Sequence, residues 1–419
     1  MFKFNFHQFK RRMLVFLAVF GPATITAMAD NDAAGVATYS LGGATLGYPI
    51  LFLLLANTIT LALTQEMGMR LAIVTRKGLG DLIREQFGIR VAVFIFSALA
   101  IANLGTIIVD LAAVKTMASM FHIPAIPAML AVIAITFLFV VRGGYRSTQN
   151  IMLFSALFYV TYIISAVRTR PDWGLAVSNL VFPHGMAVTA DYIKQYVIIG
   201  LGMLGTTITP WGQFFISSFA YDKQIDVAKL KYSQIETYAG AILTSFFTFF
   251  IIVATAATLF THGIPLVSGE DAAIAIRPFA GNLAGILFAV GILNAGFMGI
   301  VIVALSTAYA FSEFFGFSGS LDVSFTKSRT FYLLYIGQLV LAFFIIVATG
   351  VSLFQLAVAT QVLNALMLPF IFYYLLKLTD KRTLMGKYKN NALQRYAVII
   401  AAIFISLASL FVLAATFFK

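Results

Sequence analysis

Two carboxylates and an amide occupy consecutive positions inside the first long apolar stretch of the sequence. Asp30, Asn31 and Asp32 follow an apolar run that begins near Met13, and small residues lead from them to Gly35. An Asp at the centre of a bilayer costs roughly 2.5–3.5 kcal/mol to insert. A bound cation would offset that cost, and unwound backbone at such a depth is tolerated where it lines a watery cavity. We therefore expect a cation site at this break.

A second interruption lies in a later apolar stretch, where three threonines and a proline stand between Gly202 and Gly212. Pro210 removes a backbone donor and clashes with the preceding turn, so a helix would break just before it. Half-helices that end there would direct carbonyls and helix dipoles to the membrane midplane, which suits ion coordination. Taken alone, the second pattern is equally typical of a simple kink.

Composition indicates that transmembrane helices carry these residues. The chain has 419 residues, of which 61% are hydrophobic and 11% are charged. Such a chain is a helical polytopic membrane protein rather than a soluble domain. It has no cysteine, which excludes disulfides and thiolate metal sites. The net charge of +12 does not indicate nucleic-acid binding, because the basic residues fall mostly in alternate loops.

Apolar runs predict eleven spans in a single transmembrane domain over residues 1–419. They cover residues 12–41 (broken at 30–34), 46–74, 90–118, 124–141, 149–167, 190–219 (broken near 206–211), 233–260, 280–315, 328–348, 353–377 and 393–417. The breaks fall in the first and sixth spans. This places one five-helix repeat at 12–167, a second at 190–377 and an extra helix at 393–417. Interrupted spans at matching positions point to a transporter site built on an inverted repeat.

The loops between the spans predict the orientation of the chain. With eleven spans, 22 of the 28 Lys and Arg residues fall on one side of the membrane. We therefore expect a cytoplasmic amino terminus, an extracytoplasmic carboxyl terminus and a bacterial inner membrane as the location. The residues from Met1 to Arg12 lead directly into a full-length span, so we interpret them as its flank rather than as a cleaved signal. Residues 78–87 have the pattern of a short amphipathic cytoplasmic helix.

Three groups of residues, in order and with consistent spacing, resemble the motifs of one family. They are Gly21-Pro22, Asp32, Ala37-Thr38 and Gly47-Tyr48; then Gln65, Arg70-Leu71, Thr75, Leu79 and Arg84; then Gln361-Val362, Leu368-Pro369-Phe370, Thr379, Lys381, Met385-Gly386 and Asn390. The pattern is similar to that of the NRAMP divalent-metal transporters. The resemblance implies an all-α polytopic membrane protein with a LeuT-like 5+5 inverted repeat, broken helices 1 and 6, and alternating access to a midplane metal site.

By position, the resemblance also implies which residues form that site. Asp32 stands where the family has the Asp of its Asp-Pro-Gly-Asn motif. The family's two carbonyl ligands would come from Ala29 and Thr206, and the glutamine that closes onto the metal would be Gln361. The candidate metal site is completed by a further set of residues, Asp30, Asn31 and Thr209. The implied partners are the metal ion, as substrate, and the lipid bilayer; no cofactor or obligate protein partner is implied.

Several positions depart from the family's pattern. Gly35 replaces the motif's Asn, and Thr209 replaces the metal-binding Met of span 6. Trp211 replaces the His associated with proton movement, serving either to pack or to shape the cavity. In span 3 the family's Asp-Leu-Ala-Glu keeps its Asp, Asp110, and loses its Glu at Ala113. Asp30 and Asn31 are additions to the pattern.

These departures favour a hard ion. A thioether favours transition metals, and Thr209 removes that preference. Mg²⁺ prefers oxygen ligands and keeps several waters, which the small residues after Asp32 would accommodate. The pattern resembles the NRAMP-related magnesium transporters, and Mn²⁺ is expected to pass as well. Because the family's His and Glu are missing, we expect uptake without proton coupling, driven by the membrane potential.

Other functions remain open at this point. The first alternative is a proton-coupled Mn²⁺ or Fe²⁺ transporter, and the second is a Na⁺-coupled organic-solute symporter with the same fold. A sensor that does not transport is also compatible with the sequence. An enzyme has little support, because no nucleophile–base pair or His/Asp metal cluster is recognisable. We expect the intramembrane Asn57, Asn103 and Asn294 to make interhelical hydrogen bonds rather than bind the ion.

Overall fold

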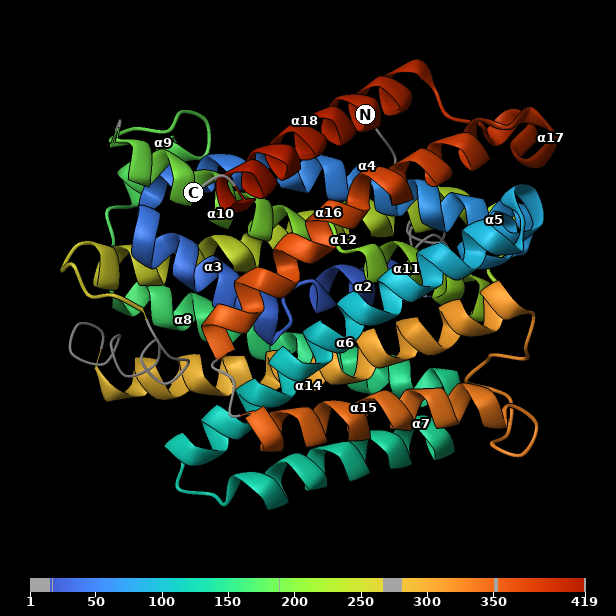
Figure 1. Ribbon diagram of the computed structural model, residues 1–419, viewed down its shortest axis with the longest axis horizontal. Helices are drawn as coiled ribbons and strands as arrows, with labels where there is room; N and C mark the ends of the chain where they lie inside the picture. The colour runs from blue at the N-terminus through green and yellow to red at the C-terminus, as the bar shows by residue number, and fades with distance from the viewer. Residues whose placement is uncertain (1–15, 17, 188, 267–280, 350–352, 418–419) are drawn as a thin grey trace, which may run out of the picture.

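The computed structural model describes residues 16, 18–187, 189–266, 281–349 and 353–417, and these residues fold into helices and connecting loops (Figure 1). The helices are α2 (Pro22–Ala29), α3 (Ala33–Leu46), α4 (Leu51–Thr75), α5 (Leu79–Phe87), α6 (Ile89–Met120), α7 (Ala125–Ala156), α8 (Val160–Arg168), α9 (Trp173–Asn179), α10 (Ala190–Thr207), α11 (Pro210–Asp222), α12 (Leu230–Thr255), α14 (Asn282–Phe315), α15 (Arg329–Thr349), α16 (Leu353–Asp380), α17 (Arg382–Met385) and α18 (Ala392–Phe417). The basic amino-terminal segment and the predicted start of span 1 lie outside the described residues.

Both predicted breaks are present. The first span consists of α2 and α3, separated by residues 30–32. The second broken span consists of α10 and α11, separated by residues 208–209. Each second half begins with a side-chain cap: Asp32 accepts from the Gly35 amide, and Thr209 accepts from the Gly212 amide. Such caps satisfy the free N–H groups of a helix start, which explains why the chain can unwind here and resume.

Eight stretches of the described residues are long and apolar enough to cross a membrane. One of them, Ala125–Arg168, has 44 residues and would be about 66 Å long as one helix, which is twice the thickness of a bilayer core. Gly144 interrupts it with a φ of 65° and a ψ of −171°, so it forms two crossings. With the two broken spans, the described part of the chain makes eleven crossings, as the sequence predicts.

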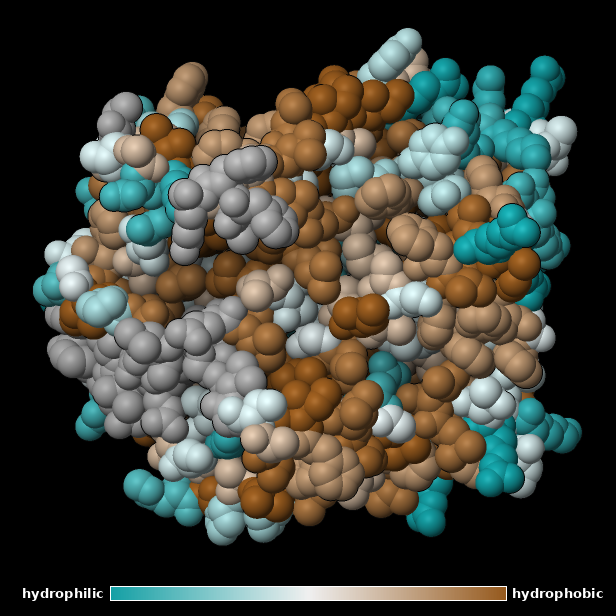
Figure 2. Space-filling view, in the orientation of Figure 1, coloured by the Kyte–Doolittle hydropathy of each residue, from teal (hydrophilic) through white to brown (hydrophobic). Residues whose placement is uncertain are grey.

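Most of α14 is buried: it packs along α6 and also contacts α8, α11 and α15. Elsewhere, α12 packs against α2, α3 and α4, while α10 packs against α3 and α16. One edge of the molecule in Figure 1 is formed by α18, which exposes Phe404, Leu407 and Leu410. Figure 2 shows hydrophobic residues over the middle of this face and hydrophilic residues gathered at the end near α5. This distribution is the one expected of a membrane protein.

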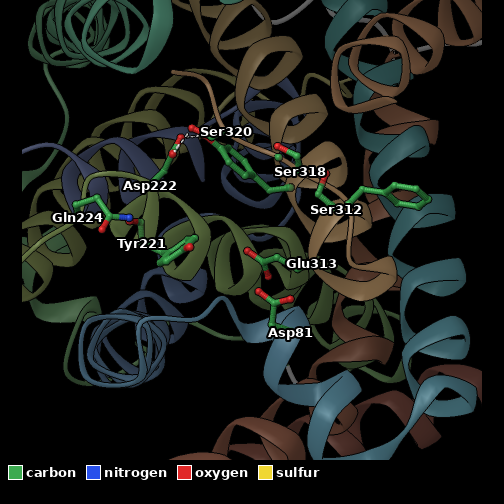
Figure 3. A pocket seen from close by; sticks show the side chains of 11 residues that line it. Asp81, Tyr221, Asp222, Gln224, Ser312, Glu313, Ser318 and Ser320 are labelled. Carbon is green, nitrogen blue, oxygen red and sulfur yellow. Dashed lines mark hydrogen bonds between the residues drawn. The ribbon is translucent and has the colours of Figure 1, made fainter. Parts of the chain in front are cut away.

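The predicted amphipathic helix at 78–87 is α5, which buries Leu79, Leu82 and Ile83. Its amino-terminal turn is fixed by α14, because the amide of Gly80 donates to Glu313 Oε2 at 2.9 Å. Beside this contact lies a cavity of about 310 Å³, whose walls carry acidic and hydroxyl side chains from α5, α11, α14 and the loop after α14 (Figure 3). Burial raises the pKa of Asp81 in this wall.

Candidate metal site

Asp30 joins the two breaks. Its carboxylate is 1% exposed and lies at the end of α2. Thr209, between α10 and α11, donates its hydroxyl to Asp30 Oδ1 at 3.2 Å. Gln65 of α4 donates from Nε2 to the other oxygen, Oδ2, at 3.2 Å. Both carboxylate oxygens of Asp30 are therefore engaged by uncharged donors.

Asp32 has a different environment. Its Oδ1 accepts from the Gly35 amide at 2.7 Å, as the cap of α3. Its Oδ2 is buried and has no hydrogen-bond partner within the part of the chain that the structure describes. A buried carboxylate oxygen left in this state is costly unless a positive group reaches it. Asp32 is thus the acid of the break that offers an open ligand atom.

The two candidate carbonyls lie at the ends of the first half-helices. Ala29 ends α2, and its carbonyl accepts from the Asp32 amide at 3.0 Å, which leaves one lone pair. Thr206 lies in the last turn of α10, and the residue four positions later is Pro210. Because Pro has no N–H, the Thr206 carbonyl cannot receive the usual helical hydrogen bond. Carbonyls at helix ends carry partial negative charge, which suits a cation.

Close packing brings α3 against α10 at this level. A Cβ added at Gly35 would lie 2.6 Å from the Asp30 carbonyl oxygen and 2.9 Å from Thr206 Oγ1. Thr206 Oγ1 is itself buried and without a partner among the described residues. The space beside Asp32 is therefore too small for a side chain on residue 35, and the room for a hydrated ion that the sequence predicts is not open in this arrangement of the helices.

Gln361 of α16 lies next to the second break. A Cβ at Gly205 in α10 would overlap the Gln361 backbone, so α10 and α16 are in close contact here. The side-chain Oε1 accepts from Asn364 Nδ2 at 2.7 Å, whereas Nε2 has no partner in the described ranges. All the groups named so far are buried, and Asp30 and Asp32 are at most 1% exposed, so the break is closed to solvent from both faces.

A sequence model of the family described as natural resistance-associated macrophage protein-like (Nramp) matches residues 23–415 of this chain. The chain belongs to the Nramp family. It is 25% identical over 407 residues to the divalent metal cation transporter MntH of Verminephrobacter eiseniae, covering 94% of this chain and 88% of the relative. It is also 25% identical over 427 residues to MntH of Staphylococcus aureus strain JH9, covering 96% and 92%. An Nramp protein is a transporter rather than an enzyme.

Solved structures support the same fold. A manganese transporter from Eremococcus coleocola superposes with a TM-score of 0.77 at 20% identity, covering 96% of this chain and 87% of that one. Mhp1, a nucleobase-cation-symport-1 family transporter, superposes with a TM-score of 0.54 at 13% identity, covering 95% and 93%. Both similarities concern the fold alone. The chain has the expected LeuT-like architecture, in which the first span (α2 and α3) and the sixth span (α10 and α11) are broken.

In this Nramp chain the side chain of one predicted ligand, Asn31, points away from the two acids of the break. The Asn31 side chain faces α12, where its Nδ2 donates to Thr244 Oγ1 at 2.9 Å and its Oδ1 accepts from Thr248 Oγ1 at 2.8 Å. Its carbonyl accepts from the Tyr159 hydroxyl at 2.8 Å. Asn31 therefore anchors the unwound segment to its neighbours instead of facing Asp32.

Two residues outside the predicted metal site hold the break in place. Asp110 of α6 accepts from the Ala33 amide at 3.0 Å, which caps α3 from a second direction. Gln65 holds Asp30, as described above. Gln65 and Asp110 both match positions of the Nramp pattern in the sequence, and an acid within a membrane span such as Asp110 indicates a functional role. The sequence could not tell which backbone group each would contact. Among the described residues, no group of three or more His, Cys, Asp or Glu could hold a metal.

Proposed function

We propose that this Nramp protein moves divalent metal ions across the membrane by alternating access, with Mg²⁺ preferred and Mn²⁺ accepted. The preference for Mg²⁺ rests on one observation. Thr209 stands at the position of the family's methionine, and its hydroxyl lies 3.2 Å from Asp30 Oδ1. The candidate ligand atoms of the two breaks are then oxygens, and soft sulfur is not among them. Hard oxygen sites suit Mg²⁺, and Mn²⁺ also accepts oxygen ligands.

In this proposal the ion binds Asp32 directly and Asp30 through water. Asp32 Oδ2 has no partner among the described groups, whereas both oxygens of Asp30 already accept hydrogen bonds. The carbonyls of Ala29 and Thr206 and the side chain of Gln361 would complete the site as it closes. Mg²⁺ dehydrates reluctantly, so a site that asks it to give up few waters lowers the cost of binding.

We also propose that transport is not coupled to protons. Trp211, which stands in place of the family's His, is fully buried, and an indole N–H carries no exchangeable charge at neutral pH. Each elementary charge gains about 2.3 kcal/mol per 100 mV of membrane potential, so a divalent cation can enter a cell without a proton. Asp110 stays in the structure as a cap of α3, which gives it a role that needs no proton transfer.

The orientation and the repeat boundaries are part of the proposal. The amino terminus and α5 would lie on the cytoplasmic side of a bacterial inner membrane, with the carboxyl terminus outside. Residues 12–167 and 190–377 would form the two inverted repeats, with 393–417 as the extra helix. The basic residues support this orientation through the positive-inside rule.

Flux of Mg²⁺ into liposomes tests this function. We expect flux with the wild-type protein and its loss in Asp32→Ala, because that variant lacks the open ligand oxygen. In Thr209→Met, a thioether returns to the site, and the ratio of Mn²⁺ flux to Mg²⁺ flux should rise about tenfold, the equivalent of ~1.4 kcal/mol. Asp191→Ala, on the exposed first turn of α10, is the matched control. Equal Mg²⁺ flux in wild type and Asp32→Ala would refute the assignment.

A second candidate is a proton-coupled transporter of Mn²⁺ or Fe²⁺. It is supported by the relatives, which are called divalent metal cation transporters, and by the Eremococcus coleocola structure, which is called a manganese transporter. Competition separates the two candidates. Millimolar Mg²⁺ should suppress Mn²⁺ uptake strongly if Mg²⁺ is the preferred ion, and it should have little effect in the second case.

A Na⁺-coupled organic-solute symporter is the third candidate, and the likeness to Mhp1 and to a Na⁺-coupled sialic acid symporter extends only to the fold. Two acids in one unwound stretch suit a cation better than an organic anion. Metal flux that persists when Na⁺ is replaced by choline would exclude this reading.

A further inference from the structure

The start of α2 is capped by a side chain of another helix. Its N-cap residue is Gly21, which has no side chain to accept from the free amides of the first turn. Glu236 of α12 takes that role, because its Oε1 accepts from the Gly21 amide at 2.7 Å and from the Thr24 amide at 3.0 Å. By contrast, α3 and α11 are capped by their own residues, Asp32 and Thr209. The capping of α2 therefore depends on where α2 lies relative to α12.

A second charged side chain holds the same end of α2. Lys223, which follows α11, donates its ammonium group to the Phe20 carbonyl and, at 3.0 Å, to Gln149 Oε1 of α7. Gln149 packs on the turn itself, because a Cβ added at Gly21 would lie 2.5 Å from the Gln149 side chain. The carboxylate binds backbone amides and the ammonium group binds a backbone carbonyl, which are the stronger, charge-assisted hydrogen bonds. We call Glu236 and Lys223 together the α2 clamp.

One row of residues on α12 follows α2 from its start to the break. The row consists of Glu236, Gly240, Thr244 and Thr248, which are spaced four residues apart. At Gly240 the two helices are in close contact, since a Cβ there would lie 3.2 Å from the Ala23 carbonyl oxygen. The two threonines bind the Asn31 side chain just beyond the other end of α2. The first half-helix is thus held by α12 at both ends.

The position of α2 keeps the metal site closed. All eight residues of α2 are buried, and Asp30 and Asp32 beyond its end are at most 1% exposed. An ion can leave the site only when an element that covers it moves. The helix α2 is about 12 Å long and consists mostly of alanine and threonine, so its displacement uncovers little apolar surface. The hydrogen bonds of the clamp are therefore a large part of what holds α2 in place.

The clamp leaves one of its own atoms unpaired. Glu236 is fully buried, and its second oxygen, Oε2, has no partner in the part of the chain that the structure describes. A buried carboxylate oxygen without a partner costs free energy. Displacement of α2 would let water reach that oxygen, which offsets part of the loss of the two amide hydrogen bonds. The free-energy difference between the two positions of α2 is therefore smaller than these hydrogen bonds alone imply.

We propose that Glu236 and Lys223 are positioning residues of transport: their hold on the start of α2 sets how often the metal site opens toward the cytoplasm. The inference rests on the proposed function, because it requires alternating access and a cytoplasmic amino terminus. Asn31, bound to α12, is the pivot, and a turn about this point moves the far end of α2 most. Neither residue of the clamp touches the ion; both act through the half-helix that leads to Ala29 and Asp30.

Single-cysteine labelling tests the clamp, since the chain has no native cysteine. Thr26→Cys probes a buried face of α2 next to Gly212. A membrane-impermeant maleimide is added from the side on which Glu85→Cys of α5 reacts. Adding Glu236→Ala should raise the labelling rate about tenfold, because hydrogen bonds to a charged group are lost. Lys223→Met should also raise it. Glu236→Gln, which keeps an acceptor oxygen, should raise it only about twofold.

A second probe and a matched carboxylate separate opening from general loosening. Thr38→Cys lies in α3, on the other side of the break, where it packs against α10. Its labelling from the opposite side of the membrane should not rise in Glu236→Ala. Glu313→Ala removes another buried carboxylate that accepts from a helix-start amide, that of Gly80, and should leave both rates unchanged. A rise at both probes, or an unchanged Thr26→Cys rate in Glu236→Ala, would overturn the proposal.

The labelling needs no metal, so its failure and the failure of the proposed function are distinguishable. If wild-type protein shows neither Mg²⁺ nor Mn²⁺ flux but labels as predicted, the function is refuted and the role of the clamp stands. If flux is present and the Thr26→Cys rate does not respond to Glu236→Ala, the function stands and the clamp is refuted.

Discussion

The two acids of the first break differ in their hydrogen bonds, although they stand two residues apart. Asp30 is held by Thr209 and Gln65, whereas one oxygen of Asp32 stays open. The difference follows from their positions, because Asp30 ends one half-helix and Asp32 begins the next. We therefore propose that Asp32 contacts the ion directly and that Asp30 contacts it through water.

The variant Gly35→Asn tests the space beside Asp32. It restores the side chain that the family has at this position, but a Cβ there would lie 2.6 Å from the Asp30 carbonyl oxygen. Overpacking of this kind costs roughly 1–3 kcal/mol. We expect a lower unfolding temperature and lower Mg²⁺ flux, with Gly35→Ala giving an effect in the same direction. Normal flux in a stable Gly35→Asn protein would show that the helices separate during transport more than this account allows.

The half-helices are the elements that position these residues, and three neighbours hold them. Asn31 ties the first break to α12, while Asp110 caps α3 from α6. Gly299 of α14 makes room for Asp110, since a Cβ there would overlap the Asp110 carboxyl group. The break is thus fixed by side chains from α6 and α12, with room left by α14, rather than by its own sequence alone.

Substitutions of Asp110 test how this residue holds the start of α3. Asp110→Asn keeps an oxygen that can accept from the Ala33 amide, so we expect near-normal stability and most of the Mg²⁺ flux. Asp110→Ala leaves that amide unpaired, which costs about 1–3 kcal/mol, and should lower both. Unfolding temperature and liposome flux measure the two effects. Loss of flux in a stable Asp110→Asn protein would indicate that the charge of Asp110 takes part in transport.

How far the sequence predicts this site depends on the kind of feature. The breaks at Asp30–Asp32 and before Pro210 are predictable, because charge at membrane depth and a missing N–H each have a local cause. The direction of each side chain in the breaks cannot be predicted from the sequence, because it depends on the dihedral angles of an unwound segment and on which helix lies beside it. Asn31 faces α12 for this reason.

For the whole molecule, the prediction of eleven crossings agrees with the structure because long apolar runs have few alternatives in a membrane. Length alone misleads at the merged helix 125–168, where the positive φ of Gly144 resolves it, and at the two broken spans, which do not count as long apolar helices. With eleven crossings, α5 and α9 lie at opposite ends of the molecule, as Figure 1 shows.

Single cysteines test the orientation, and the chain has no native cysteine to interfere. We expect Val177→Cys in α9, where Val177 is 55% exposed, to react with a membrane-impermeant maleimide in intact cells. Glu85→Cys in α5 should react only after the cells are permeabilised. The reverse pattern would place the amino terminus outside and would contradict the proposed orientation.

The central claim is that a divalent ion, preferably Mg²⁺, crosses on an oxygen site without a proton. The most direct measurement records Mg²⁺ uptake and internal pH together in liposomes that contain the wild-type protein under an imposed inside-negative potential. The account predicts Mg²⁺ uptake that follows the potential, with no acidification dependent on Mg²⁺. Acidification in step with Mg²⁺ entry would contradict the absence of coupling, and Mn²⁺ uptake without any Mg²⁺ uptake would contradict the choice of ion.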